Sequence, residues 1–188
     1  MITLVCLLEE PSAKKMLEVV LPRIVPPAIQ IRYISFQGKQ DLERNVTRKI
    51  QHWLIPDSYF LIMRDQDSGN CLEIKQNLVR KTIETGKPER CLIRIACHEL
   101  EAFYLGDLAA VEAGLGIRAL DAKQNNRKYR EPDTLSNAAE ELSNLTRGSY
   151  QKIDGSRNIA PHLKLDGTNR SRSFNVLIRG VRNLLGSQ

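Results

Sequence analysis

Three short apolar runs, each followed by acidic residues, constrain the fold of this chain most strongly. The runs cover Ile2–Leu8, Tyr59–Met63 and Cys91–Cys97, and none of them alternates regularly between polar and apolar residues. Such runs are typical of parallel strands that are buried on both faces. The segments between the runs are long enough to supply the helical crossovers that parallel strands require. The sequence therefore predicts an α/β fold with a mainly parallel sheet and helices on both faces.

The remaining segments complete this pattern and divide the chain into two parts. Residues 29–36 alternate in polarity and predict a strand that is exposed on one face. A further helix is expected to begin at Pro11, because proline suits the first helical turn. Apolar residues at helical spacing predict helices over residues 41–54, 72–85, 135–145 and 174–185. We expect an α/β core over residues 1–105 and a helical C-terminal extension over residues 106–188, packed on the core within a single structural domain.

Charge and composition limit the partners and the environment of the chain. The 188 residues carry 28 Lys and Arg against 22 Asp and Glu, a formal net charge of +6 that permits a polyanionic partner without requiring one. No apolar run approaches the roughly 20 residues of a membrane-spanning helix, and no signal-peptide pattern opens the chain. The four cysteines form no CxxC pair, which favours reduced, buried thiols over a zinc site. We expect a cytoplasmic protein that does not bind membranes.

Acidic residues follow three of the predicted strands directly. They are Glu9 and Glu10, Asp65 and Asp67, and Glu99 and Glu101. The carboxyl ends of parallel strands share one edge of a sheet, where ligands bind in open α/β folds. Like charges gathered there repel one another unless a cation bridges them, and carboxylate oxygens are ligands that Mg²⁺ prefers. The pattern predicts a divalent cation site at this edge, while solvated loop acids and helix caps remain the alternative.

The order strand–Glu–helix followed by strand–Asp-x-Asp–helix resembles the Toprim domain of topoisomerases, primases and OLD-type nucleases. More narrowly, the chain resembles an uncharacterised Toprim-like family encoded beside AAA-type ATPases in bacterial genomes, often in phage-defence or mobile loci. The stretches that carry the resemblance are LVCLLEEPSAKKML, YFLIMRDQDSG, IRIACHELEAFYLGD and SRSFNVLIRGVRNL. The chain departs from the family pattern at Glu10, where a glycine is usual, and at Ala13, where a second acid is common.

The resemblance implies a Toprim-like core over residues 1–105 and a nuclease or related phosphodiester-cleaving activity that depends on Mg²⁺ or Mn²⁺. Glu9, Asp65, Asp67 and Glu99 would be the catalytic residues and would also hold the metal. Glu101 is a fifth candidate ligand, although we expect Glu99 rather than Glu101 to face the site. The implied partners are nucleic acid, with DNA as the expected form, and a neighbouring AAA-type ATPase in a defence or DNA-processing system.

Two groups of basic residues are candidates for nucleic-acid contact. The polar segment 121–132 holds the first group, Lys123, Arg127, Lys128 and Arg130. This segment could follow a phosphate backbone or could form a solvated loop. The second group lies near the C-terminus, could reach a phosphate or an acidic partner, and consists of Arg170, Arg172, Arg179 and Arg182.

Two other functions also fit the acidic strand ends. A response-regulator receiver gathers acids at the same edge, but it needs a lysine after a fifth strand, and the sequence has no such strand. A non-enzymatic regulatory partner of an ATPase could retain a residual metal site, and the departures at Glu10 and Ala13 favour this alternative slightly. The chain has no GxxxxGK[ST] motif, so any ATP dependence would come from another protein.

Overall fold

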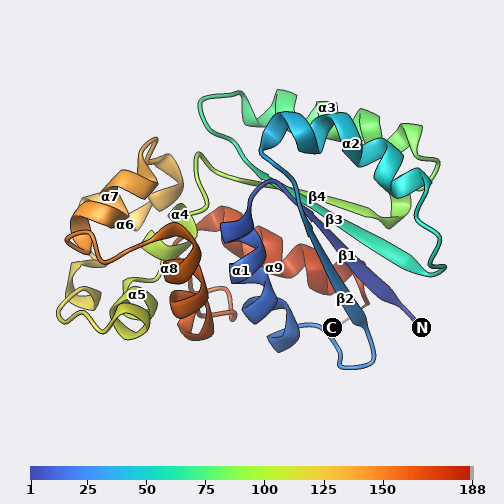
Figure 1. The fold of residues 1–188 in the computed structure, drawn as a ribbon. Helices are drawn as coiled ribbons and strands as arrows, with labels where there is room; N and C mark the ends of the chain where they lie inside the picture. Colours follow the sequence, from blue (N-terminus) through green and yellow to red (C-terminus); the bar gives the residue numbers. More distant parts are fainter. Residues whose placement is uncertain (187–188) are drawn as a thin grey trace.

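A parallel four-stranded sheet forms the centre of the computed structural model, which describes residues 1–186 (Figure 1). The strands are β1 (Thr3–Leu8), β2 (Gln30–Ser35), β3 (Ser58–Asp65) and β4 (Cys91–Ala96). Their order across the sheet is β2-β1-β3-β4, and every neighbouring pair is parallel. The central strands β1 and β3 are two of the three apolar runs, because a strand covered on both faces has no side that water reaches. The third apolar run forms β4, which lies at an edge of the sheet and is only partly buried.

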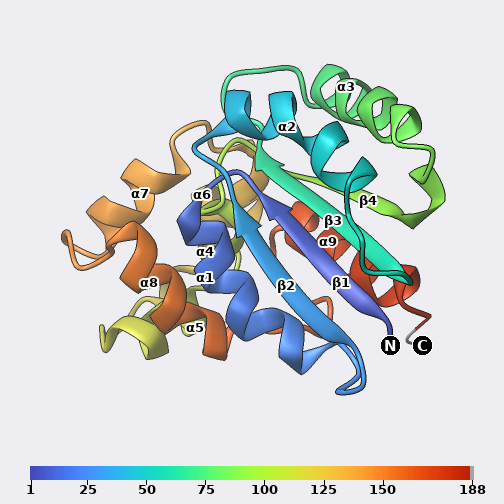
Figure 2. The ribbon, with the colours of Figure 1, turned by 45° about the vertical axis from the view of Figure 1, so that its right-hand side comes forward.

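Helices cover both faces of the sheet. Figures 1 and 2 show α2 (Lys39–Gln51) and α3 (Cys71–Glu84) above it, with α1 (Pro11–Val20) and α9 (Arg172–Leu184) below. Side chains of β1 alternate between two hydrophobic clusters, with Val5 and Leu7 in one cluster and Leu4, Cys6 and Leu8 in the other. The predicted α/β fold, with its parallel sheet and helices on both faces, is confirmed.

The second half of the described chain is helical, as predicted. Its α-helices after β4 are α4 (Ala102–Leu105), α5 (Leu108–Leu115), α6 (Arg127–Arg130), α7 (Ala138–Leu145), α8 (Lys152–Ile159) and α9. Short 3₁₀ turns are η1 (Leu21–Arg23), η2 (Pro88–Arg90), η3 (Asp121–Lys123), η4 (Pro132–Thr134) and η5 (Ala160–His162). Helices α4 to α8 gather at the left of Figure 1, where α8 packs on α1. They share one hydrophobic cluster with β1, α1 and α9.

The predicted helices are present, with ends that differ by up to three residues. The segments predicted over 41–54, 72–85, 135–145 and 174–185 are helical over 39–51, 71–84, 138–145 and 172–184. Segment 121–132, expected as a loop, contains two short helical pieces because the buried side chain of Tyr129 anchors it. All four cysteines are free thiols, of which Cys6 is buried. No helix within residues 1–186 has the length and apolar character that crossing a membrane requires.

Candidate functional site

The predicted carboxylates lie where β1, β3 and β4 end. Leu8 pairs with Met63, and Asp65 pairs with Ala96, so the three strands end at the same edge. The Asp65 backbone N–H donates to Glu9 Oε2 at 2.9 Å, which links the ends of β1 and β3. The Leu100 N–H donates to Asp65 Oδ2 at 3.1 Å. Asp65 is thereby held between β1 and the segment that leads from β4 into α4.

The turns after β3 and β4 hold each other in place. Asp67 and His98 both have left-handed backbone conformations, with φ values of 53° and 56°. The Asp67 N–H donates to the His98 carbonyl at 2.7 Å, and the His98 N–H donates to Gln66 Oε1 at 3.2 Å. Non-glycine residues in this conformation are uncommon and cluster at functional sites, where the surrounding structure maintains them.

The Asp67 carboxylate lies next to two basic side chains of the same chain. Lys39 Nζ, at the start of α2, lies 2.7 Å from Asp67 Oδ2, and Arg64 Nη2 lies 3.6 Å from the same oxygen. Arg64 is buried, pairs with Glu43 and approaches Glu9 Oε2 to 3.8 Å. On this side of the edge, lysine and arginine therefore balance the carboxylate charge.

The other side of the edge holds carboxylates with less compensation. Asp65 and Glu101 are both buried, and Glu101 is 0% exposed. Burial raises the pKa of Asp65 well above its usual range, and the charges of Glu10, Glu101 and Glu9 raise it further. Burial likewise raises the pKa of Glu101, although a hydrogen bond from Tyr150 opposes this shift. Within the described residues, Glu101 Oε2 has no hydrogen-bond partner, so the fold leaves one carboxyl oxygen of this cluster unsatisfied.

Glu9 lies between the two sides of the edge. Burial raises its pKa, while the Asp65 N–H and the Arg64 charge act in the opposite direction. A carboxylate in this position is partly desolvated and still reachable from the edge.

The helical C-terminal half contributes two groups that sequence reasoning missed. Lys152, the first residue of α8, places Nζ 3.7 Å from Glu10 Oε2. Although partial burial acts to lower the Lys152 pKa, the charges of Glu101 and Glu10 raise it overall. The Tyr150 hydroxyl donates to Glu101 Oε1 at 2.8 Å. No local pattern identifies these residues, because only the packing of α8 on α1 brings them to the edge.

The structure places Glu101 closer to Asp65 than the expectation for Glu99 and Glu101 assumes, and it gives Glu99 a partner in α7. Glu99 Oε2 accepts a hydrogen bond from the Ala139 N–H at 2.7 Å, in the first turn of α7. A carboxylate is favoured at a helix N-terminus by the helix dipole. Glu101 instead lies close enough to Asp65 to raise its pKa. Residues 97–101 are not helical, because His98 has a left-handed backbone conformation and α4 begins only at Ala102.

The basic segment 121–132 is a folded part of the structure. Lys128 pairs with Glu141, and the buried Tyr129 hydroxyl donates to the same carboxylate at 2.7 Å. Arg130 Nε donates to the Asn125 carbonyl at 2.8 Å. The remaining two basic side chains, Lys123 and Arg127, are exposed.

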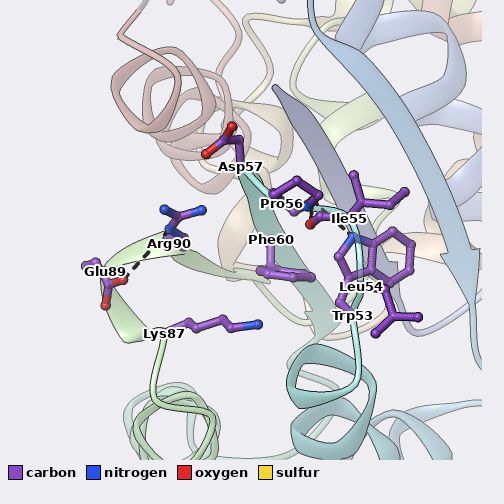
Figure 3. A pocket seen from close by; sticks show the side chains of 10 residues that line it. Trp53, Leu54, Ile55, Pro56, Asp57, Phe60, Lys87, Glu89 and Arg90 are labelled. Carbon is purple, nitrogen blue, oxygen red and sulfur yellow. Dashed lines mark hydrogen bonds and ion pairs between the residues drawn. The ribbon is translucent and has the colours of Figure 1, made fainter. Parts of the chain in front are cut away.

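A separate hollow of about 420 Å³ lies at the opposite edge of the sheet, where β3 begins (Figure 3). Trp53 and Phe60 meet edge to face there, and Trp53 Nε1 donates to Ser58 Oγ at 3.0 Å. Lys87 and Arg90 line its other side. None of the predicted site residues lines this hollow, so it is distinct from the acidic edge.

The donor chemistry of the acidic edge suits a hard divalent cation. Carboxylate oxygens are what Mg²⁺ and Mn²⁺ prefer, and the unpartnered oxygen of Glu101 is a donor that the fold leaves free. Within residues 1–186, no three His, Cys, Asp or Glu side chains already stand close enough to hold a metal ion. Cation binding at Asp65 and Glu101 would therefore require a further carboxylate to move closer through a rotamer change. Glu9 and Glu10 are the nearest candidates for this third ligand.

Comparison with known proteins gives one match. Residues 8–182 match the model of a family described as a domain of unknown function, DUF4276. No curated protein and no solved structure matches the chain. The matched range includes Glu9, Asp65, Glu101 and Lys152, so the acidic edge lies within the family's domain.

Proposed function

This chain belongs to the DUF4276 family, and we propose that it is a divalent-metal-dependent phosphodiester hydrolase that acts as a nuclease. One observation carries the proposal: Glu9, Glu10, Asp65 and Glu101 converge at the carboxyl edge of a parallel sheet, and two of them are buried. Buried acids with raised pKa values lower the stability of a fold at neutral pH, so their clustering points to a functional site. The resemblance of the strand–acid pattern to Toprim domains supports the same assignment.

The metal would be held first by Asp65 and Glu101, with Glu9 and Glu10 beside them. Asp67 could join these ligands where its ion pairs with Lys39 and Arg64 open. When bound, Mg²⁺ or Mn²⁺ would neutralise charge on a phosphate group and favour deprotonation of a water molecule.

Residues around the proposed metal position can hold protons and contact a phosphate group. Before a metal binds, Glu101 can hold a proton more readily than an exposed glutamate, because its pKa is raised, and Tyr150 fixes its orientation through Oε1. Glu9, with its raised pKa, is a candidate general base or acid. The half-exposed ammonium group of Lys152 can contact a phosphate oxygen, since it reaches the edge and faces solvent.

We further propose that the protein acts in the cytoplasm together with an AAA-type ATPase in a bacterial defence or DNA-processing system. This part of the proposal rests on the resemblance to families encoded beside such ATPases. The absence of a GxxxxGK[ST] motif agrees with ATP hydrolysis by a separate protein.

One observation favours a second candidate, a regulatory partner of an ATPase without catalytic activity. Lys39 and Arg64 already pair with Asp67, so half of the Asp-x-Asp pair is neutralised without a metal. In this alternative, the edge would bind a cation for structure or regulation and would not cleave phosphodiester bonds.

Titration calorimetry and a cleavage assay separate these functions. Mn²⁺ and Mg²⁺ are titrated into wild type and Asp65→Asn, with Asp57→Asn as the matched control at the opposite, exposed edge of the sheet. We expect saturable binding that Asp65→Asn removes and Asp57→Asn keeps, together with Mn²⁺-dependent cleavage of plasmid or single-stranded DNA. Binding without cleavage, also with candidate ATPases added, would favour the regulatory alternative. No binding at millimolar metal, with DNA present, would contradict the proposed metal site.

A further inference from the structure

The exposed side of α9 carries arginine side chains that no carboxylate neutralises. Arg172 and Arg179 are exposed, and Arg182 is partly exposed. Their spacing of seven and three residues places them on one side of the helix. Within residues 1–186, none of the three forms an ion pair. This side of α9 therefore presents free positive charge.

Arg94 of β4 adds a fourth positive charge next to this stripe. Its guanidinium group occupies a notch at Gly180, where an added Cβ atom would lie 2.1 Å from Nη2. Nε donates to the Val176 carbonyl at 3.2 Å and Nη1 to the Ile93 carbonyl at 2.7 Å, so only neutral groups hold it. Burial lowers the pKa of Arg94, and the neighbouring charge of Arg179 lowers it further. The fold keeps two guanidinium groups near each other, which an anion between them would stabilise.

The stripe borders an open hollow of about 680 Å³ between α9 and residues 165–167. Its polar lining includes Arg172, Arg179 and Arg182, and Asp166 is the acidic residue on its rim. The Asp166 carboxylate accepts hydrogen bonds from the Thr168 hydroxyl and N–H, at 2.6 and 3.0 Å. The hollow thus has a net positive lining that is accessible from solvent.

The stripe begins at the acidic edge and leads away from it. At the first turn of α9, Ser173 Oγ accepts a hydrogen bond from the Cys97 N–H at 3.5 Å, directly after β4. The helix then runs back along the sheet and ends near the N-terminus of the chain (Figure 2). At about 1.5 Å per residue, Arg172 and Arg182 are separated by roughly 15 Å along the axis.

We propose that Arg94, Arg172, Arg179 and Arg182 form a track that binds the phosphate backbone of a nucleic-acid strand as it passes the acidic edge. This inference rests on the proposed nuclease function and assigns the substrate-binding surface for that site. A length of roughly 15 Å corresponds to the axial length of about four nucleotides of duplex DNA, at about 3.4 Å per nucleotide of each strand. Guanidinium groups match phosphate oxygens in a bidentate geometry, which favours arginine for this role.

This proposal places the nucleic-acid-binding surface on α9, whereas the sequence also suggests the polar segment 121–132. In that segment Lys128 is paired with Glu141, and Tyr129 is buried and cannot stack on a base. Lys123 and Arg127 therefore provide a matched pair of exposed basic residues for a control.

Fluorescence anisotropy tests the track with a labelled 20-nucleotide DNA, single-stranded and duplex, in EDTA so that no cleavage occurs. The test variant is Arg179→Gln/Arg182→Gln, and the control is Lys123→Gln/Arg127→Gln. We expect the test variant to bind duplex about fivefold or more weakly at 0.1 M salt. Its slope of log affinity against log salt should fall by about 1.8, since each lost phosphate contact removes about 0.9. The control should change affinity less than about twofold, and Arg179→Lys/Arg182→Lys should retain the wild-type slope.

Unchanged binding by the test variant would overturn the proposal, as would a loss confined to the control or no DNA binding by wild type. Circular dichroism melting of each variant shows whether it is folded. Because the assay needs neither metal nor cleavage, its outcome is separate from that of the proposed function. Track-dependent binding by a protein that never cleaves DNA would keep the track and contradict the nuclease. Cleavage by a protein whose DNA binding does not depend on the track would support the nuclease and contradict the track.

Discussion

We predict that a substitution at the buried Glu101 stabilises the protein, whereas most substitutions in a protein core destabilise it. The side chain is 0% exposed, and Oε1 accepts the Tyr150 hydroxyl at 2.8 Å. Oε2 has no hydrogen-bond partner among the described residues. Glu101→Gln keeps the shape and the Oε1 acceptor but removes a charge from the neighbourhood of Asp65 and Glu10. We therefore expect the metal-free protein to become more stable.

The magnitude follows from the cost of burying a charge, because the amide nitrogen that replaces Oε2 gains no new partner and only the charge is removed. A buried polar group without a partner costs about 1–3 kcal/mol, and more when it is charged. Recovery of about 1–2 kcal/mol would raise the melting temperature by roughly 2–8 °C for a chain of this size. Burial raises the Glu101 pKa above its unfolded value, so its stabilising contribution is present at low pH and is lost as pH rises through the folded pKa. Since glutamine does not titrate, the gain should be larger at pH 8 than at pH 5.

Thermal melts in EDTA at pH 5 and pH 8 measure this difference, with Glu141→Gln as the matched control. Although burial acts to raise the Glu141 pKa, hydrogen bonds from Lys128 and Tyr129 lower it overall. Glu141 therefore contributes stability above its unfolded pKa, which is lost as pH falls, and its replacement should cost about 1–2 kcal/mol at pH 8. The reasoning is refuted if both substitutions destabilise the protein, or if the gain from Glu101→Gln is the same at both pH values.

Two further predictions concern the metal and the packing of the helical half. Mn²⁺ should raise the unfolding free energy of wild type by about 2.7 kcal/mol at 100 times its Kd, and differential scanning fluorimetry should show no such shift for Asp65→Asn. Gly114→Ala should cost about 1–3 kcal/mol in urea unfolding, because its Cβ would lie 2.6 Å from the Asn158 carbonyl oxygen and 2.7 Å from Ile159 Cα. The exposed neighbouring substitution Ala113→Ser should change stability by less than about 0.5 kcal/mol, and equal effects at both positions would contradict the packing argument.

The sheet could be predicted from the sequence because each strand is recognised from the polarity of a few consecutive residues. A strand covered on both faces is expected to be apolar, and the central residues of β1 and β3, Leu4–Leu8 and Phe60–Met63, are apolar and buried, with polar residues only at the strand ends. The acids Glu9 and Asp65 could be placed at one edge for the same reason, since parallel strands end together. The half-exposed β2 and the amphipathic helices likewise follow from periodicity alone.

The rest of the site depends on contacts between distant segments, which periodicity does not encode. Lys152 and Tyr150 reach the edge only because α8 packs on α1. Glu101 rather than Glu99 turns toward Asp65 because His98 takes a left-handed conformation, which breaks any helical spacing through this segment. The same left-handed turn places Glu99 at the start of α7, where it serves as a cap.

Glu10 departs from the pattern of the Toprim-like sequences that the chain resembles, and its contacts in the folded chain bear on that departure. A glutamate stands where a glycine is usual in the Toprim-like sequences, which suggests a weakened site when the sequence is considered alone. In the structure its carboxylate accepts the Ser12 hydroxyl and faces Lys152 from α8. Its charge is thus balanced, and it remains near enough to raise the Asp65 pKa.

The two aspartates of the Asp-x-Asp pair therefore have different environments and different tasks. Lys39 and Arg64 balance the charge of Asp67, and this arrangement stabilises the fold without a metal. Asp65 lies among Glu9, Glu10 and Glu101, and within residues 1–186 the ion pair of Lys152 is with Glu10. A divalent cation gains most where the negative charge is least compensated. Under the proposed function, cation binding would therefore begin on the Asp65 side of the edge, and Asp67 would contribute only after its ion pairs separate.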